Sequence, residues 1–210
     1  MTKLSGTILD GDSRPERLGA GTGPSNTPAE TLYWHEIDSP IGRLLLAGDG
    51  DSLIQVSFQA GPRPLQPPGT WRPGAAPFRA AIAQLGEYFA GRRLQFELPL
   101  APRGTEFQRR VWHALREIPY GETISYGELA CRIGKPGASR AVGLANGANP
   151  LPIVVPCHRV IGADGSLTGF GGGLPIKRTL LALERAGGQK DESPQEAFKW
   201  PADPQPSIAR

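Results

Sequence analysis

A cysteine and a histidine stand side by side in the segment PIVVPCHRVIG, residues 152–162. The chain has only two cysteines and three histidines, so this pairing uses a large share of its reactive side chains. Alone, a cysteine such as Cys157 is more often a small buried hydrophobic residue than a nucleophile. Beside His158 it gains a base that can raise the small fraction of reactive thiolate present at neutral pH.

The two side chains can act together only if the backbone bends. In a regular strand, neighbours point to opposite faces. Pro156 interrupts strand pairing just before the pair and favours a departure from the extended form. We therefore expect a turn that brings the imidazole of His158 to the sulfur of Cys157, directly or through one water. Glu184, further along the chain, is a candidate third member that would orient the histidine.

Helices must position this segment, and the apolar spacing predicts four of them after residue 100. They span residues 105–118, 125–134, 138–146 and 174–187, and a strand is expected over 152–155. Capping boxes open the first two helices, with Thr105 and Gln108 in one and Ser125 and Glu128 in the other. This half of the chain is therefore expected to be mostly helical.

The second and third of these helices, joined by the turn GKPGA, form a helix-turn-helix pattern. Such a unit can present its second helix to DNA, although an ordinary helical hairpin has the same pattern. Small residues surround a single long cation, Arg140, in this second helix. They are Ala138, Ser139, Ala141 and Gly143. Such a surface suits close approach to a duplex with insertion of one cation, and it equally suits close helix packing.

The first half of the chain predicts a small α+β unit without obvious chemistry. Strands are expected over 31–38, 42–50, 52–58 and 94–100, a helix over 78–91 and a Pro/Gly-rich loop over 61–77. We place domains at 30–100 and 101–187. Composition predicts flexible tails over 1–29 and 188–210.

Composition excludes several classes of protein. The 210 residues carry a net charge of +3 and a pI of about 9.1, which is compatible with a polyanionic partner but weak evidence for one. No apolar run has the length of a membrane span, and the N-terminus lacks the apolar core of a signal peptide. Two cysteines make neither a disulfide framework nor a cysteine-based zinc site. We expect a cytoplasmic protein in a reducing compartment.

The segment NPLPIVVPCHRVIG, preceded by SRAVGLANGAN and followed by GFGGGLPIKRTLLALE, closely resembles the O6-alkylguanine-DNA alkyltransferase family, also called methylated-DNA–protein-cysteine methyltransferases. The resemblance is strong over about 105–186 and looser over 31–100. It implies an α/β protein with a small, ribonuclease H-like α+β N-terminal domain. A mostly helical C-terminal domain with a DNA-binding helix-turn-helix would follow.

The resemblance also implies roles for the catalytic residues. Cys157 would be the nucleophile and alkyl acceptor, and His158 the base, acting through a water. Glu184 would orient the histidine, and Asn149 would link the DNA-binding helix to the active site. Arg140 would fill the space left by a flipped nucleotide, with Ala138, Ser139, Ala141 and Gly143 beside it on the DNA-binding surface.

Tyr126 would crowd the phosphate and promote flipping. The substrate pocket would be lined by Tyr126, Pro152, Val160, Phe170, Gly171 and Gly172. Some members carry Tyr and Ser where this chain has Phe170 and Gly171. Loss of a hydroxyl removes one hydrogen bond to the guanine oxygen and predicts a roomier pocket that admits larger alkyl groups.

By this resemblance the chain would flip O6-alkylguanine, and O4-alkylthymine, out of duplex DNA and take the alkyl group in a single turnover. The partner would be double-stranded DNA with alkylated bases, approached from the minor groove. We expect no cofactor, no metal, a monomer and a nucleoid-associated location, and leave cooperative assembly on DNA open. Two other classes remain as hypotheses. One is an inert lesion-binding protein, and the other is a cysteine hydrolase, which would need an oxyanion hole.

Overall fold

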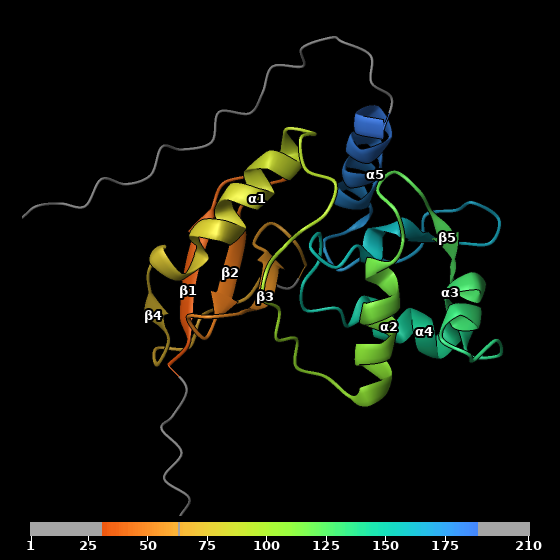
Figure 1. The fold of residues 1–210 in the computed structure, drawn as a ribbon, viewed down its shortest axis with the longest axis horizontal. Coiled ribbons are helices and arrows are strands. Elements are labelled where there is room, and N and C mark those ends of the chain that lie inside the picture. Colours follow the sequence, from red (N-terminus) through yellow and green to blue (C-terminus); the bar gives the residue numbers. More distant parts are fainter. Residues whose placement is uncertain (1–30, 63, 189–210) are drawn as a thin grey trace, which may run out of the picture.

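The computed structural model describes residues 31–62 and 64–188. Figure 1 shows a sheet with one covering helix beside a group of helices. This arrangement confirms the expected α/β class, with an N-terminal sheet domain and a mostly helical C-terminal domain. The tails expected over 1–29 and 188–210 lie outside the described residues, except for Gly188, which ends the last helix.

The N-terminal domain is a four-stranded sheet with the order β3-β2-β1-β4. Its strands are β1 (Tyr33–Ile37), β2 (Leu44–Gly48), β3 (Leu53–Phe58) and β4 (Arg72–Pro73). The first three pair antiparallel, as an alternating sequence with tight turns predicts, and β4 pairs parallel with β1. No pattern in the sequence indicates β4, because a two-residue strand inside a Pro/Gly-rich loop has no periodicity.

Strand β2 is buried along its whole length, so the sheet is covered on both faces at this strand. Leu44 and Leu46 belong to the main core together with Leu85 of α1 (Arg79–Phe89), the helix that covers one face of the sheet in Figure 1. Each such leucine contributes about 2 kcal/mol when it is fully buried. The loop after β3 joins the sheet through the Leu65 backbone N–H, which donates to Ser57 Oγ at 3.2 Å.

The strand expected over 94–100 is wrong. Only Leu100 pairs, in an isolated parallel bridge to Leu53. Phe96 and Leu98 pack against the core from an irregular segment, which explains the alternating pattern. Pro99 has no N–H to donate to a strand ladder, although its carbonyl accepts from the Leu53 N–H at 2.9 Å.

The C-terminal domain contains the four expected helices. They are α2 (Glu106–Arg116), α3 (Tyr126–Arg132), α4 (Ser139–Gly147) and α5 (Leu174–Gly188). Both predicted capping boxes form, at the starts of α2 and α3. The chain leaves α3 through Gly134 at φ 68°, a conformation that favours glycine. Two short strands, β5 (Ile124–Ser125) and β6 (Val160–Ile161), pair in parallel.

The strand expected over 152–155 is also wrong, because the segment folds into a tight turn. Pro152 and Val155 form an isolated bridge, and Ile153 lies at φ 76°. All four residues are buried, so their composition resembles that of a buried strand. After Pro156 the 3-10 helix η2 (Cys157–Arg159) begins, so the expected departure from the extended form is confirmed.

One continuous hydrophobic core joins the two domains. The Val56 N–H donates to Pro150 O at 2.8 Å, next to the segment that carries the Cys–His pair. The ring centroids of Phe58 and Phe170 lie 5.5 Å apart. The sheet domain therefore contacts the C-terminal domain close to its reactive residues.

Candidate active site

Cys157 begins the 3-10 helix η2 and is 4% exposed. Burial raises the pKa of its thiol to about 11. The Asn149 side chain, the positive charge of Lys177 and nearby backbone N–H groups act in the opposite direction. The thiol is therefore neutral at pH 7 and needs a base before it can attack.

His158 is fully buried, and its Nε2 lies 2.7 Å from Glu184 Oε1. An ionised carboxylate can only accept hydrogen bonds, so the network assigns the proton to Nε2 and the lone pair of the neutral ring to Nδ1. Nδ1 has no hydrogen-bond partner among the described residues. The structure thus brings Glu184 to His158 and leaves Nδ1 as the atom that can accept a proton.

Glu184 accepts hydrogen bonds from four residues in three separate parts of the chain. Oε1 accepts from Tyr88 Oη at 2.8 Å, His158 Nε2 at 2.7 Å and Arg159 Nη2 at 3.0 Å, and Oε2 accepts from Arg159 Nε at 2.8 Å and the Gly121 N–H at 3.1 Å. Burial alone would raise the pKa of Glu184, but hydrogen bonds from His158 and Arg159 and their charges lower it to about 2. Glu184 therefore stays ionised and holds the imidazole without taking its proton.

The pKa of His158 is lowered, chiefly because burial disfavours the charged ring. Glu184 acts in the opposite direction, while the positive charges of Arg159 and Lys177 add to the lowering. A neutral imidazole at pH 7 is the form that a general base requires.

Two asparagines tie the end of α4 to the Cys157 segment. Asn149 Nδ2 donates to Val155 O at 2.8 Å, and its Oδ1 accepts from the Leu151 N–H at 3.0 Å. Asn146 Nδ2 donates to Cys157 O at 3.3 Å. The sequence prediction named Asn149 as this link, and the geometry adds Asn146.

The predicted DNA-binding residues lie along α4 and at its start. Arg140 and Ala141 are exposed, while Ala138, Ser139 and Gly143 are half-buried. Tyr126 is the first residue of α3, and its ring would meet a Cβ at Gly143 at 3.7 Å. The Tyr126 hydroxyl accepts a hydrogen bond from Thr168 Oγ1 at 3.1 Å. Tyr126 therefore lies between the second helix of the helix-turn-helix and the loop over 168–173.

The predicted pocket residues other than Tyr126 lie before and after the Cys157–His158 pair in the sequence. Pro152 and Val160 are buried, Phe170 is half-buried, Gly171 is exposed and Gly172 is buried. The ring centroids of Phe170 and His158 lie 6.5 Å apart. A Cβ at Gly172 would lie 2.8 Å from the Phe58 ring, so the close approach of the two domains requires glycine there.

Sequence reasoning missed Lys177, Arg159 and Tyr88. Lys177 is fully buried, and its Nζ donates to Val160 O at 2.6 Å and Thr168 O at 3.0 Å, which ties β6 to the start of the loop over 168–173. The sequence does mark Lys177, because it lies seven residues before Glu184. The two charged residues therefore lie on the same, otherwise apolar, face of the helix. Arg159 stands among apolar residues, which signals a paired charge. No local pattern marks Tyr88.

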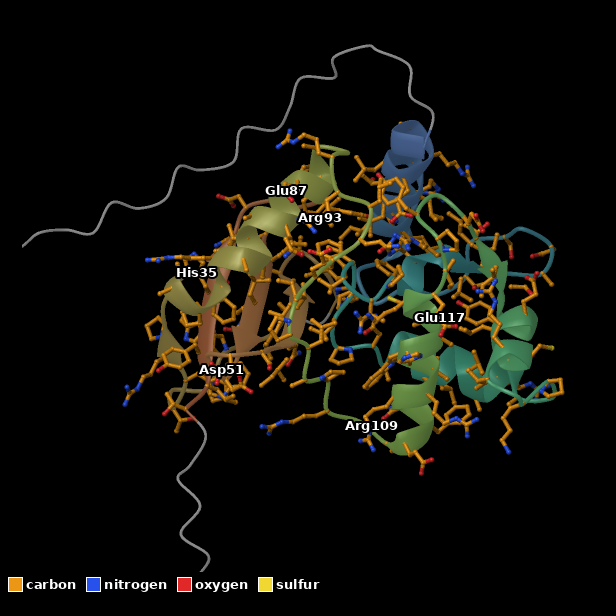
Figure 2. All side chains as sticks on the ribbon, in the orientation of Figure 1. His35, Asp51, Glu87, Arg93, Arg109 and Glu117 are labelled. Carbon is orange, nitrogen blue, oxygen red and sulfur yellow. The ribbon has the colours of Figure 1, made fainter. Side chains whose placement is uncertain are left out.

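A cavity of about 400 Å³ lies away from the Cys157 sulfur. It is bordered by the end of α2, where Figure 2 labels Glu117, and by Tyr120 and Arg159. Cys157 does not line it. The cavity therefore borders Arg159, a partner of Glu184, and is not the predicted base pocket.

No helix within residues 31–62 and 64–188 is long and apolar enough to cross a membrane. In the same part of the chain, no three His, Cys, Asp or Glu side chains gather as a metal site would require.

Comparisons with known proteins match both halves of the chain. Residues 32–102 match the family described as the 6-O-methylguanine DNA methyltransferase ribonuclease-like domain, and residues 106–186 match the DNA binding domain of the same protein class. The methylated-DNA–protein-cysteine methyltransferase of Methanosarcina acetivorans is 56% identical over 153 residues, which cover 73% of this chain and 98% of that protein. The enzyme of the same name from Mycolicibacterium paratuberculosis is 58% identical over 155 residues, covering 73% and 93%.

A crystal structure of Mycobacterium tuberculosis OGT in complex with DNA is similar in fold and sequence. It has a TM-score of 0.69 and 54% identity, covering 74% of this chain and 94% of that one. The matches of both domains and the names of these relatives indicate the same family, and the arrangement of Cys157, His158 and Glu184 is consistent with it. The chain belongs to the methylated-DNA–protein-cysteine methyltransferase family.

Proposed function

We propose that this protein repairs DNA by moving the alkyl group of O6-alkylguanine irreversibly onto its own Cys157. The observation that carries the proposal is a buried thiol beside a His158–Glu184 pair, joined by Asn149 and Asn146 to the second helix of a helix-turn-helix. The names of the relatives and the DNA complex of the Mycobacterium tuberculosis protein support the same function.

The transfer exchanges one bond for another. His158 Nδ1 accepts the thiol proton, in the family pattern through a water. The Cys157 sulfur then bonds to the alkyl carbon as the carbon–O6 bond breaks, and the electron pair stays with guanine. The proton returns from His158 to the guanine, so atoms and charge balance. Glu184 keeps its charge and stabilises the imidazolium while it exists.

The product explains why one molecule acts once. Cys157 becomes a thioether, which water does not readily cleave, unlike the thioester of a cysteine hydrolase. The other cysteine, Cys131, is exposed and far from a CxxC spacing, so it offers no route to regenerate the thiol.

The target must leave the base stack before Cys157 can reach it, because O6 of a stacked guanine is inaccessible to a buried thiol. Extrusion costs a few kcal/mol, and less for a damaged, poorly paired base. We assign Arg140 to the space left in the duplex and Tyr126 to the phosphate beside it, from the minor groove. The half-buried Phe170 and the glycines after it form the pocket wall, which we expect to admit O4-alkylthymine and larger alkyl groups.

Intact-mass spectrometry tests the proposal. After incubation with a duplex that contains O6-methylguanine, we expect the protein to gain one methyl group that maps to Cys157. The Cys157→Ala variant should gain none. An unchanged mass despite tight binding would indicate an inert lesion-binding protein, and repeated turnover without a stable adduct would indicate a hydrolase. Either result would overturn the proposal.

The remaining expectations are proposals that this experiment does not test. They are a domain division at 30–100 and 101–187, a monomeric protein for which cooperative assembly on DNA stays open, and a cytoplasmic, nucleoid-associated location.

A further inference from the structure

We propose that Tyr88, a residue of the N-terminal domain, is a positioning residue for alkyl transfer, because its hydroxyl shares one oxygen of Glu184 with the base His158. This inference rests on the proposed function and extends it. It assigns the N-terminal sheet domain a part in the chemistry of the C-terminal domain, through a contact between residues 96 positions apart in the chain.

The contact is short and fully enclosed. Tyr88 lies in the second half of α1 and is 0% exposed, and its Oη donates to Glu184 Oε1 at 2.8 Å. Three aromatic rings hold the Tyr88 ring, with centroid distances of 5.4 Å to Phe89, 5.4 Å to Phe96 and 6.0 Å to Tyr120. The hydroxyl therefore has one fixed direction, toward the carboxylate.

The shared oxygen distinguishes this role from ordinary packing. Glu184 Oε1 accepts both the Tyr88 O–H and the His158 Nε2–H, so the two donors compete for the same electron density. A buried tyrosine with a purely structural role needs only some acceptor for its hydroxyl. Here the acceptor atom is the one that sets the orientation and the basicity of the proposed base.

The other charged and titratable groups around the pair are also held by hydrogen bonds. Arg159 from η2 donates to both oxygens of Glu184, and Lys177 from α5 faces the pair with a positive charge. Tyr120, from the connection after α2, borders Tyr88 but donates to Leu183 O, at 3.5 Å. Burial and the adjacent Glu184 raise the pKa of Tyr88 well above its ordinary value, so its hydroxyl stays a donor at every working pH.

Removal of the Tyr88 hydroxyl should make His158 easier to protonate. Glu184 Oε1 would then interact more strongly with the His158 Nε2–H, which favours the positively charged imidazolium. Protonation of His158 removes the base, so the transfer rate falls at low pH. This fall, the acid limb of the pH profile, should therefore move to higher pH in the variant. One hydrogen bond corresponds to a shift of about half a pH unit to one unit.

The experiment measures single-turnover transfer from the free base O6-benzylguanine to the full chain between pH 5 and pH 8. This substrate removes DNA binding from the readout. We expect the acid limb of Tyr88→Phe to lie about half a unit to one unit above that of the wild type. The matched control is Tyr120→Phe, which deletes a neighbouring hydroxyl that donates to Leu183 O instead of Glu184 and should leave the limb in place.

A second variant provides a test that does not depend on whether Tyr88→Phe folds. Replacement of Tyr88 by 3-fluorotyrosine retains the ring and the hydroxyl but makes the hydroxyl a stronger donor, so the limb should move to lower pH. Overlapping profiles for the wild type and both Tyr88 variants would overturn the proposal, as would equal shifts in Tyr120→Phe. Failure of the proposed function looks different, since the wild type would then transfer no alkyl group to Cys157 at any pH.

Discussion

Burial has opposite consequences for Cys157 and His158, and together they define the resting state. It raises the pKa of the thiol to about 11 and lowers the pKa of the imidazole, so both groups are neutral at pH 7. With such a pKa, about one thiol in ten thousand is a thiolate at that pH. Attack therefore depends on proton transfer to His158 in the reaction itself.

The His158→Ala variant should consequently regain activity with rising pH. Without the base, only thiolate formed by direct ionisation can attack, so the rate should rise about tenfold for each pH unit between 7 and 10. The wild type should vary much less over this range. Single-turnover transfer from O6-benzylguanine measures both, and His113→Ala, which removes an exposed histidine of α2, is the control. A flat profile for His158→Ala would contradict the prediction.

At the scale of elements, α4 carries an apolar side chain that its small-residue pattern did not suggest. Leu144 is 79% exposed, and it lies one turn after Arg140 on the same side of the helix. Only one other large hydrophobic residue of the described part of the chain is exposed, Leu94 in the N-terminal domain, at 52%. An exposed leucine beside Arg140, the residue proposed to enter the duplex, suits an apolar contact in the proposed minor-groove interface.

We predict that Leu144→Ala binds duplex DNA about tenfold more weakly, because it loses part of the free energy of burying a leucine. Arg140→Ala should reduce repair in duplex DNA far more than Leu144→Ala does. Both should keep the wild-type rate on O6-benzylguanine, which needs no flipping. Fluorescence anisotropy with a labelled duplex and single-turnover rates give the two readouts. Leu94→Ala is the matched control, and equal losses in both leucine variants would rule out a specific contact.

The elements that could be predicted from the sequence are those with local signals. The capping boxes at Thr105 and Ser125 placed two helix starts correctly, because the cap and its partner lie three residues apart. Pro156 likewise indicated the backbone break before Cys157. The composition of the turn over 152–155 predicts a strand, wrongly, because its apolar residues reflect burial and not strand pairing. Tyr88 could not be predicted, since only the packing of two domains brings it to Glu184.

At the scale of the whole molecule, Glu184 joins parts of the chain that are distant in sequence. Its carboxylate accepts hydrogen bonds from α1 of the N-terminal domain, from the connection after α2 and from η2. The same ionised group thus supports the proposed chemistry and the contact between domains. Removal of its charge should affect stability as well as transfer.

Acid should therefore destabilise the protein in two separate pH windows. The pKa of His158 is lowered from 6.5 in the folded state, so unfolding gains protons and stability falls as the pH drops below about 6.5. The pKa of Glu184 is lowered from 4.5 to about 2, so its contribution is complete above about 4.5 and is lost as the pH falls toward 2. That shift in pKa corresponds to a contribution of about 3 kcal/mol to the free energy of unfolding.

Urea unfolding followed by tryptophan fluorescence at pH 7, 5.5, 4, 3 and 2 measures the free energy of unfolding across both windows. We expect His158→Ala to lose the upper window, because the imidazole is the group that titrates in it. The lower window should shrink but persist, because Glu184 loses the hydrogen bond from His158 and keeps those from Arg159. We expect Glu184→Gln, which is less stable at pH 7 because Arg159 loses its charged partner, to lose the lower window. A carboxyl carbon NMR titration of the wild type reads Glu184 directly, and an ordinary pKa for that carboxyl would contradict its role as the charged link between the domains.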